Sequence, residues 1–259
     1  SDGQMLFMLH GVKKLKEGSG RMAIIQNGSS LFTGDAGSGA SEIRRYVIEG
    51  DLVEAIIQLP TDLFYNTGIS TYIWVLTKGK AMHRSGKVQL IDASKCFVKR
   101  RKNIGSKRVD LDDVCIDMII KAYEEFADKS YEADGLVVES KVFDNSFFGF
   151  TKVTVETAQA DKNGKPVLKN GKNVAVKGAS DNEIIPLGED FDAYMEKNVL
   201  PYNPLAYIDP SKDKIGYEVP FTRLFYKFVA PEASADIFED IKALEAEETM
   251  LMKELFGNE

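Results

Sequence analysis

The chain has 259 residues, and its 44% hydrophobic content is ample for the core of one large domain or two smaller ones. The net charge of −7 argues against a non-specific coat for nucleic acid, although it does not exclude local contacts with DNA. No segment resembles a signal peptide or a run of 18 apolar residues, so we expect an intracellular, cytoplasmic protein that makes no use of the membrane.

Cysteine and histidine are scarce. Cys96 and Cys115 form no CxxC pair, so the sequence favours two buried free thiols over a disulfide or a metal site. His10 and His83 are the only histidines, which leaves little material for a Ser-His-Asp triad or a histidine-ligated zinc. We therefore predict no metal centre.

Residues 4–15 have the apolar spacing of a helix, and three short apolar runs come after them. Each run is rich in Ile and Val, is too short for an ordinary helix and is bounded by Gly, Pro or polar residues, which is typical of buried strands. The runs lie at residues 22–26, 53–59 and 71–77.

A helix is predicted between the first two runs, at residues 41–49, because Ile43, Tyr46 and Val47 fall on one helical face and Gly50 follows. The order strand, helix, strand predicts a parallel crossover unit. The glycine-rich loop before this helix lacks the third glycine of GxGxxG and any following Lys-Ser/Thr, so we interpret it as a capping loop rather than a phosphate site.

The segment PTDLFYNTGIS, residues 60–70, joins the second and third runs without a strong pattern. A loop of this length between core strands is more often functional than not. Asn27 and Gly28 end the first run, at the carboxyl edge where open α/β sheets bind ligands. A simple turn and a substrate contact both remain open for this pair.

Basic residues are concentrated after a further predicted strand at residues 87–93. Seven of them fall within fourteen residues that contain no acid: Lys95, Lys99, Arg100, Arg101, Lys102, Lys107 and Arg108. We predict that Lys99, Arg100, Arg101 and Lys102 contact the DNA backbone, the alternative being a solvated face. An amphipathic helix should begin near Asp112.

The pattern becomes β-rich from residue 137 to residue 185. FFGFTKVTVE, NVAVKG and EIIPL read as strands, and Asn163-Gly164 and Asn170-Gly171 are hairpin turn signals. A short helix is predicted at residues 189–198, and residues 202–228 should pack as ordered irregular chain.

The last predicted element is a helix at residues 234–256 with a short heptad pattern. Its narrow apolar seam consists of Ile237, Ile241, Leu244, Leu251 and Leu255, with Glu248 at the missing step. We predict that this seam is a subunit interface, the alternative being that it packs on its own domain.

A family resemblance follows from the succession GRMAIIQNGSSLF, IRRYVIE, LVEAIIQLPTDLFYNTGISTYIWVLTK, VQLIDAS and PYNPLAYIDPSKDKIGYEVPFTRLFYKF. In this order the segments resemble the methylation (M) subunit of type I restriction-modification systems, from near Leu6 to the C-terminus. The resemblance implies an S-adenosylmethionine-dependent DNA adenine-N6 methyltransferase.

Two signatures of that family are missing: the glycine-rich cofactor loop and the Asn-Pro-Pro-aromatic tetrapeptide that holds the target amino group. The resemblance thus implies the C-terminal part of an M subunit, with no catalytic residue of its own. We expect this part alone to be inactive and to bind no cofactor, and S-adenosylmethionine to serve the full-length protein.

The target-base pocket is the function that the resemblance assigns to the loop at residues 60–70. By position, Phe64 or Tyr65 resembles the aromatic residue that many amino methylases place after the sixth strand, and Asn27 is a further candidate for the pocket. For Phe64, the alternative is a core residue that anchors the loop.

The expected fold class is α/β: the C-terminal half of a Rossmann-like methyltransferase sheet at residues 1–110, an α+β module with β-hairpins at 111–230 and an assembly helix at 231–259. The implied partners are a specificity subunit, a restriction subunit, a second M subunit and double-stranded DNA. Two other hypotheses are a non-catalytic interaction scaffold and a nucleotide-binding Rossmann protein, the latter weakened by the failed glycine pattern.

Overall fold

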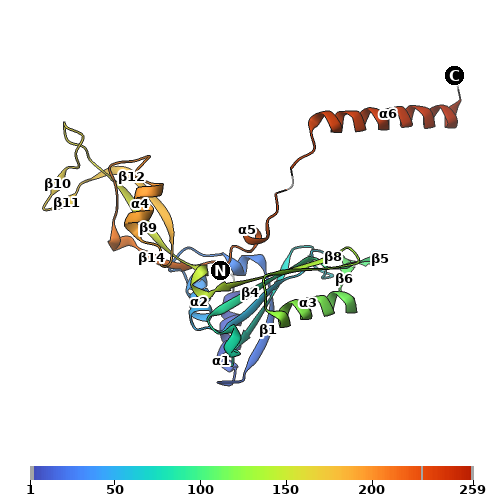
Figure 1. Ribbon diagram of the computed structural model, residues 1–259, viewed down its shortest axis with the longest axis horizontal. Coiled ribbons are helices and arrows are strands. Elements are labelled where there is room, and N and C mark those ends of the chain that lie inside the picture. The colour runs from blue at the N-terminus through green and yellow to red at the C-terminus, as the bar shows by residue number, and fades with distance from the viewer. Residues whose placement is uncertain (1–2, 229, 258–259) are drawn as a thin grey trace. The chain divides into compact units, whose positions relative to one another are not determined.

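The structure, a computed structural model, describes residues 3–228 and 230–257 (Figure 1). Two compact units are present, one extending to Phe225 and one beginning at Tyr226. The helices of the first unit are α1 (Gln4–Lys14), α2 (Gly39–Glu49), α3 (Asp113–Glu125), α4 (Phe191–Asn198) and α5 (Phe221–Phe225).

The main sheet is mixed and has the strand order β1-β3-β2-β4-β8-β7. Its strands are β1 (Arg21–Asn27), β2 (Val53–Gln58), β3 (Thr71–Thr77), β4 (Lys87–Lys95), β7 (Lys129–Ala133) and β8 (Leu136–Asp144). The predicted strands are confirmed, and β1 and β2 point the same way, as the crossover requires. They are not neighbours, however, because β3 lies between them and pairs antiparallel with both.

Both faces of the main sheet are covered, which explains why its strands read as continuous apolar runs. Ile56 and Trp74 pack with α1 and α2 on one face. Ile57 and Ile73 pack with α3 on the other. The predicted start of α3 is also confirmed, since the Asp112 side chain accepts a hydrogen bond from the Cys115 amide at 2.9 Å.

Helix α2 differs from its predicted face. Tyr46 is half exposed, whereas Arg44 is fully buried. The guanidinium of Arg44 donates to three backbone carbonyls, those of Tyr217 at 2.6 Å, Thr33 at 2.9 Å and Ser30 at 3.2 Å. Burial lowers the pKa of Arg44 to about 10, so it keeps its charge at neutral pH.

The predicted β-rich segment forms a second sheet around β9 (Gly149–Ala158). Its partners are β12 (Ala175–Pro186), β13 (Ala206–Ile208) and β14 (Lys214–Tyr217), and helix α4 packs on it. The two expected strands NVAVKG and EIIPL are one irregular strand, β12. Residues 202–228, expected to be irregular, contain β13, β14 and α5.

The hairpin signal Asn170-Gly171 is confirmed. It forms the turn between the short strands β10 (Leu168–Lys169) and β11 (Lys172–Asn173), and both of its residues have positive φ.

The predicted free thiols are confirmed. Cys96 and Cys115 are unpaired and fully buried, and burial raises the pKa of Cys96 to about 12. The Cys96 thiol donates to the Cys115 carbonyl at 3.8 Å. Since the thiolate is the reactive form, neither cysteine is placed for nucleophilic chemistry.

The second unit contains helix α6 (Ser234–Phe256). The expected boundary at residue 110 falls inside the first unit, where β7 and β8 share a sheet with β1–β4. The division into three domains stays a prediction.

Candidate functional site

One edge of the main sheet gathers the chain segments that the sequence marks as functional. Asn27 at the end of β1 is opposite Thr71 at the start of β3. Gln58 at the end of β2 pairs with Tyr72 on one side and with Asp92 of β4 on the other. The carboxyl ends of β1 and β2 therefore open at the same edge, as the ligand-binding edge of an open α/β sheet does.

Asn27 has a local structural role at this edge. Its side-chain oxygen accepts hydrogen bonds from the amide and the hydroxyl of Ser29, at 3.1 and 2.5 Å, and caps the short 3-10 turn Gly28–Leu31. The side-chain oxygen is thus engaged in a turn, and a contact between Asn27 and a substrate stays a prediction.

We call residues 60–70 the edge loop. The two ends of this loop are joined by the hydrogen bond from the Leu59 amide to the Thr71 carbonyl at 2.9 Å. An isolated bridge between Phe64 and Thr67 narrows it into a tight turn that carries Tyr65 at its tip. Tyr65 is 68% exposed, which suits a ring that meets a ligand.

Phe64 is half-buried, but in the described part of the chain neither it nor Tyr65 is a member of the three hydrophobic clusters. The structure therefore gives no support to Phe64 as a core residue. Of the two rings, Tyr65 is the one presented to solvent.

The basic segment forms a hairpin that the sequence did not predict, made of β5 (Val98–Ile104) and β6 (Lys107–Asp110). We call it the basic hairpin. Asp110 pairs with Arg100 and, at 2.8 Å, with Lys107. Lys99, Arg101, Lys102 and Arg108 are exposed on the same hairpin. Of the four residues predicted to contact DNA, Arg100 thus already has a carboxylate partner.

The basic hairpin and the edge loop are joined by backbone hydrogen bonds. The Ser106 amide donates to the Tyr65 carbonyl at 2.9 Å, and the Arg108 amide donates to the Asp62 carbonyl at 2.8 Å. The structure thus brings together two sites that the sequence suggested independently, about forty residues apart.

A small cavity of about 240 Å³ lies at the same edge, next to Gly28 and Tyr72. Its other side comes from residues 219–223, where Phe221 meets the Tyr72 ring edge-on at 5.3 Å between centroids. Burial, with a smaller contribution from Asp92, raises the pKa of Tyr72. Sequence reasoning missed both aromatic residues, because only the fold places Phe221 beside the start of β3.

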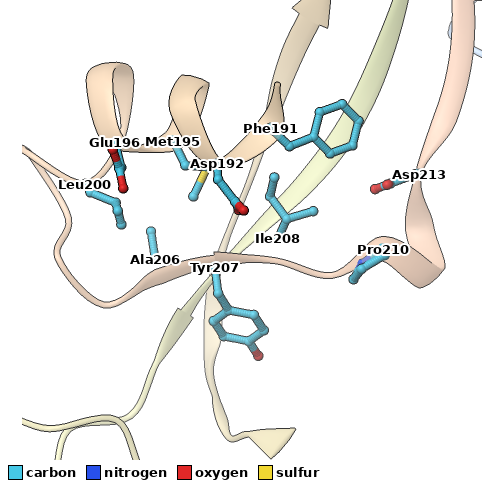
Figure 2. A pocket seen from close by; sticks show the side chains of 10 residues that line it. All are labelled: Phe191, Asp192, Met195, Glu196, Leu200, Ala206, Tyr207, Ile208, Pro210 and Asp213. Carbon is cyan, nitrogen blue, oxygen red and sulfur yellow. The ribbon is translucent and has the colours of Figure 1, made fainter. Parts of the chain in front are cut away.

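A larger cavity of about 560 Å³ lies between α4 and β13 (Figure 2). Met195 and Ile208 supply apolar lining, and Asp192, Glu196 and Asp213 supply an acidic border. Burial raises the pKa of the Asp213 carboxyl, with a smaller effect from Asp209. No residue that the sequence singled out for function lines this cavity.

The five seam residues of α6 are all exposed, by 44% at Ile237 to 74% at Leu255. They repeat at the predicted spacing along one helix, so the seam is an apolar stripe of the second unit. Its role as a subunit interface stays a prediction.

In the part of the chain that the structure describes, no group of three or more His, Cys, Asp and Glu side chains is arranged to hold a metal ion. Within residues 3–228 and 230–257, no helix combines the length and apolar character needed to cross a bilayer.

The family is established by a comparison with known families. The model of the N-6 DNA methylase family matches residues 1–162, well over half of the chain, so this chain belongs to the N-6 DNA methylase family. The mixed α/β sheet agrees with that membership.

The curated relatives are methylase subunits of type I restriction enzymes, as the sequence resemblance predicted. The MjaIX subunit of Methanocaldococcus jannaschii is 33% identical over 164 residues, 62% of this chain and 26% of the relative. The MjaVIII subunit of the same organism is 35% identical over 108 residues, 42% of this chain and 18% of the relative. The EcoKI subunit of Escherichia coli is 35% identical over 79 residues, 30% of this chain and 14% of the relative.

The matched segments therefore span between 14% and 26% of the length of these three relatives. Among solved structures, a type I methyltransferase subunit from Streptococcus thermophilus shares 29% identity with a TM-score of 0.47, over 56% of this chain and 27% of that one.

Proposed function

We propose that this chain is the C-terminal part of a type I methylation subunit, which transfers a methyl group from S-adenosylmethionine to N6 of adenine in DNA. The observation that carries the proposal is the exposed Tyr65 ring, on a backbone-fixed turn at the ligand-binding edge, in a chain of the N-6 DNA methylase family.

An enzyme that modifies a base inside a duplex must first extrude that base from the stack. The exposed Tyr65 ring offers a face on which an extruded adenine stacks, and Phe64 precedes it in the same turn. Such stacking contributes about 1–3 kcal/mol per base. The chain's own part in the reaction is thus to hold and orient the base.

The cofactor supplies the methyl group when it is bound, but the described residues at this edge of the sheet do not fit it on their own. The cavity beside Tyr72 is about 240 Å³, smaller than ordinary ligand pockets of about 300–1,000 Å³, and its lining is mostly apolar. The sequence also lacks the glycine-rich loop and the Asn-Pro-Pro-aromatic tetrapeptide. We therefore assign cofactor binding and the catalytic tetrapeptide to the remainder of the subunit.

The first prediction concerns the assignment of cofactor binding to the remainder of the subunit. Calorimetric titration of this chain with S-adenosylmethionine should give no appreciable binding, whereas the complete subunit should bind it. With a specificity subunit, the complete subunit should also methylate adenine in DNA. A micromolar dissociation constant for this chain alone would contradict the first expectation.

The alternative function is a non-catalytic scaffold in which the sheet merely supports α6. It predicts that the complete subunit neither binds the cofactor nor methylates DNA. We place the active protein in the cytoplasm, where it would act with double-stranded DNA, a specificity subunit, a restriction subunit and a second methylation subunit.

The second prediction concerns α6, for which we propose an assembly role. Removing residues 234–259 should leave a cooperatively folding body that no longer co-purifies with the specificity subunit. A helix of this length is marginal alone in water, so the exposed seam needs a partner surface. Full burial of five such side chains contributes about 7.5–15 kcal/mol before association costs, at about 1.5–3 kcal/mol each.

A point variant refines this test. Placing a charge at the centre of the seam, with Leu244→Glu, should abolish co-purification with the specificity subunit. The control Ala243→Glu, which places the same charge outside the seam, should preserve it. If the truncated body aggregates or loses its cooperative melting, the helix belongs to the domain's own fold and the assembly role fails.

A further inference from the structure

The basic hairpin and the edge loop are joined by three backbone hydrogen bonds, from the amides of Ser106, Arg108 and Val109. We propose that the basic hairpin is a positioning element for the target base: it fixes the turn that carries Tyr65 and holds the phosphates next to the extruded nucleotide. This inference rests on the proposed adenine-methylating function.

The hydrogen bonds between the two segments bracket the Tyr65 turn. One end is held at the Asp62 carbonyl, which accepts the Arg108 amide at 2.8 Å and the Val109 amide at 3.4 Å. The other end is held at the Tyr65 carbonyl, which accepts the Ser106 amide at 2.9 Å. With both ends tied to the hairpin, the backbone of the turn that carries Tyr65 is held in place before a base arrives, which lowers the ordering cost of binding.

Gly105 makes this contact possible. It lies at the tip of the basic hairpin with φ +58°, and a Cβ built on it would be 2.3 Å from the Tyr65 carbonyl oxygen. That oxygen is backbone and cannot swing aside as a side chain can. Any larger residue at position 105 must therefore push the hairpin tip away from the edge loop.

The charges on the basic hairpin are divided between two roles. Arg100 and Lys107 share Asp110, so one of their two positive charges is compensated within the hairpin. Lys99, Arg101, Lys102 and Arg108 are exposed, and no salt bridge with them occurs among the described residues. Since Arg108 also supplies the amide that holds Asp62, the uncompensated charge and the Tyr65 turn belong to the same rigid element. Phosphates are the chemical groups that this charge fits.

The test compares Gly105→Ala with Gly135→Ala in the complete subunit assembled with its specificity subunit. Gly135 lies in the tight turn between β7 and β8 with φ +79°, and a Cβ there meets nothing within 4 Å. The control thus has the same kind of backbone strain without the clash. A DNA duplex with 2-aminopurine at the target adenine reports base extrusion by fluorescence, and an unmodified duplex reports single-turnover methylation.

We expect Gly105→Ala to lower the extrusion signal and to slow single-turnover methylation by about tenfold or more, since each tenfold corresponds to about 1.4 kcal/mol. Its dissociation constant for DNA and its melting temperature should match those of Gly135→Ala. Equal extrusion and methylation in the two variants would overturn the positioning role. An inactive wild-type assembly would instead contradict the proposed function itself.

The charge role has its own test, which leaves the backbone contacts intact. The variant Arg101→Gln, Lys102→Gln, Arg108→Gln should weaken DNA binding and flatten the slope of log K against log salt by about three, with an unchanged recognition sequence. The matched control neutralises Lys13, Lys14 and Lys16, exposed residues at the other end of α1 from Gln4, which lies near the edge. Equal slopes for the two triple variants would overturn the phosphate role.

Discussion

Replacing Tyr65 by alanine in the complete methylase should lower methylation by about tenfold to a hundredfold without changing its melting temperature. The physical reason is the loss of about 1–3 kcal/mol of stacking on the extruded base. Because Tyr65 is 68% exposed and outside the core clusters, its ring contributes little to folding. Single-turnover methylation and thermal unfolding of the same preparation measure the two effects.

Two further variants complete the Tyr65 experiment. Tyr202→Ala removes another highly exposed tyrosine, 88% exposed and distant in sequence from the edge loop, and should leave methylation unchanged. Phe64→Ala tests the second ring of the turn. Wild-type rates in folded Tyr65→Ala and Phe64→Ala proteins would refute the base-pocket interpretation of the edge loop.

The other large effect concerns stability. Arg44→Ala should lower the free energy of unfolding by about 3–5 kcal/mol, because it leaves three carbonyls, two of them in buried hydrogen bonds, without their charged donor. Those carbonyls belong to residues 30, 33 and 217, so Arg44 joins the segment after β1 to β14. Urea denaturation followed by circular dichroism measures the loss.

The neighbouring arginine provides the control. Arg45 lies one residue further along α2 and pairs with Glu49 at 3.0 Å on the helix surface. Such an exposed pair, four residues apart, contributes about 0.3–0.5 kcal/mol, so Arg45→Ala should be nearly neutral. If the two alanine variants prove equally stable, the hydrogen bonds of Arg44 do not stabilise the fold as its contacts indicate.

The sequence by itself determined the elements whose signals are local. The apolar runs predicted β1, β2 and β3, Asp112 marked the start of α3, and Asn170-Gly171 marked a turn. For the strands the local signal is a short apolar run, for α3 it is a cap bond to the third residue on, and for the turn it is a positive φ. The place of the edge loop was also predicted, because it lies between two recognisable strands.

Only the tertiary structure decided which elements meet. Strand β3 lies between β1 and β2, which no periodicity encodes, since a strand's pattern shows which faces are buried and not which neighbour it has. The buried charge of Arg44 depends on the carbonyl of Tyr217, 173 residues away, and so a helical wheel favoured Tyr46 instead. The link between Ser106 and Tyr65 is likewise a backbone hydrogen bond between distant segments. Backbone amides and carbonyls are the same in every residue, so the sequence carries no mark of which ones will pair.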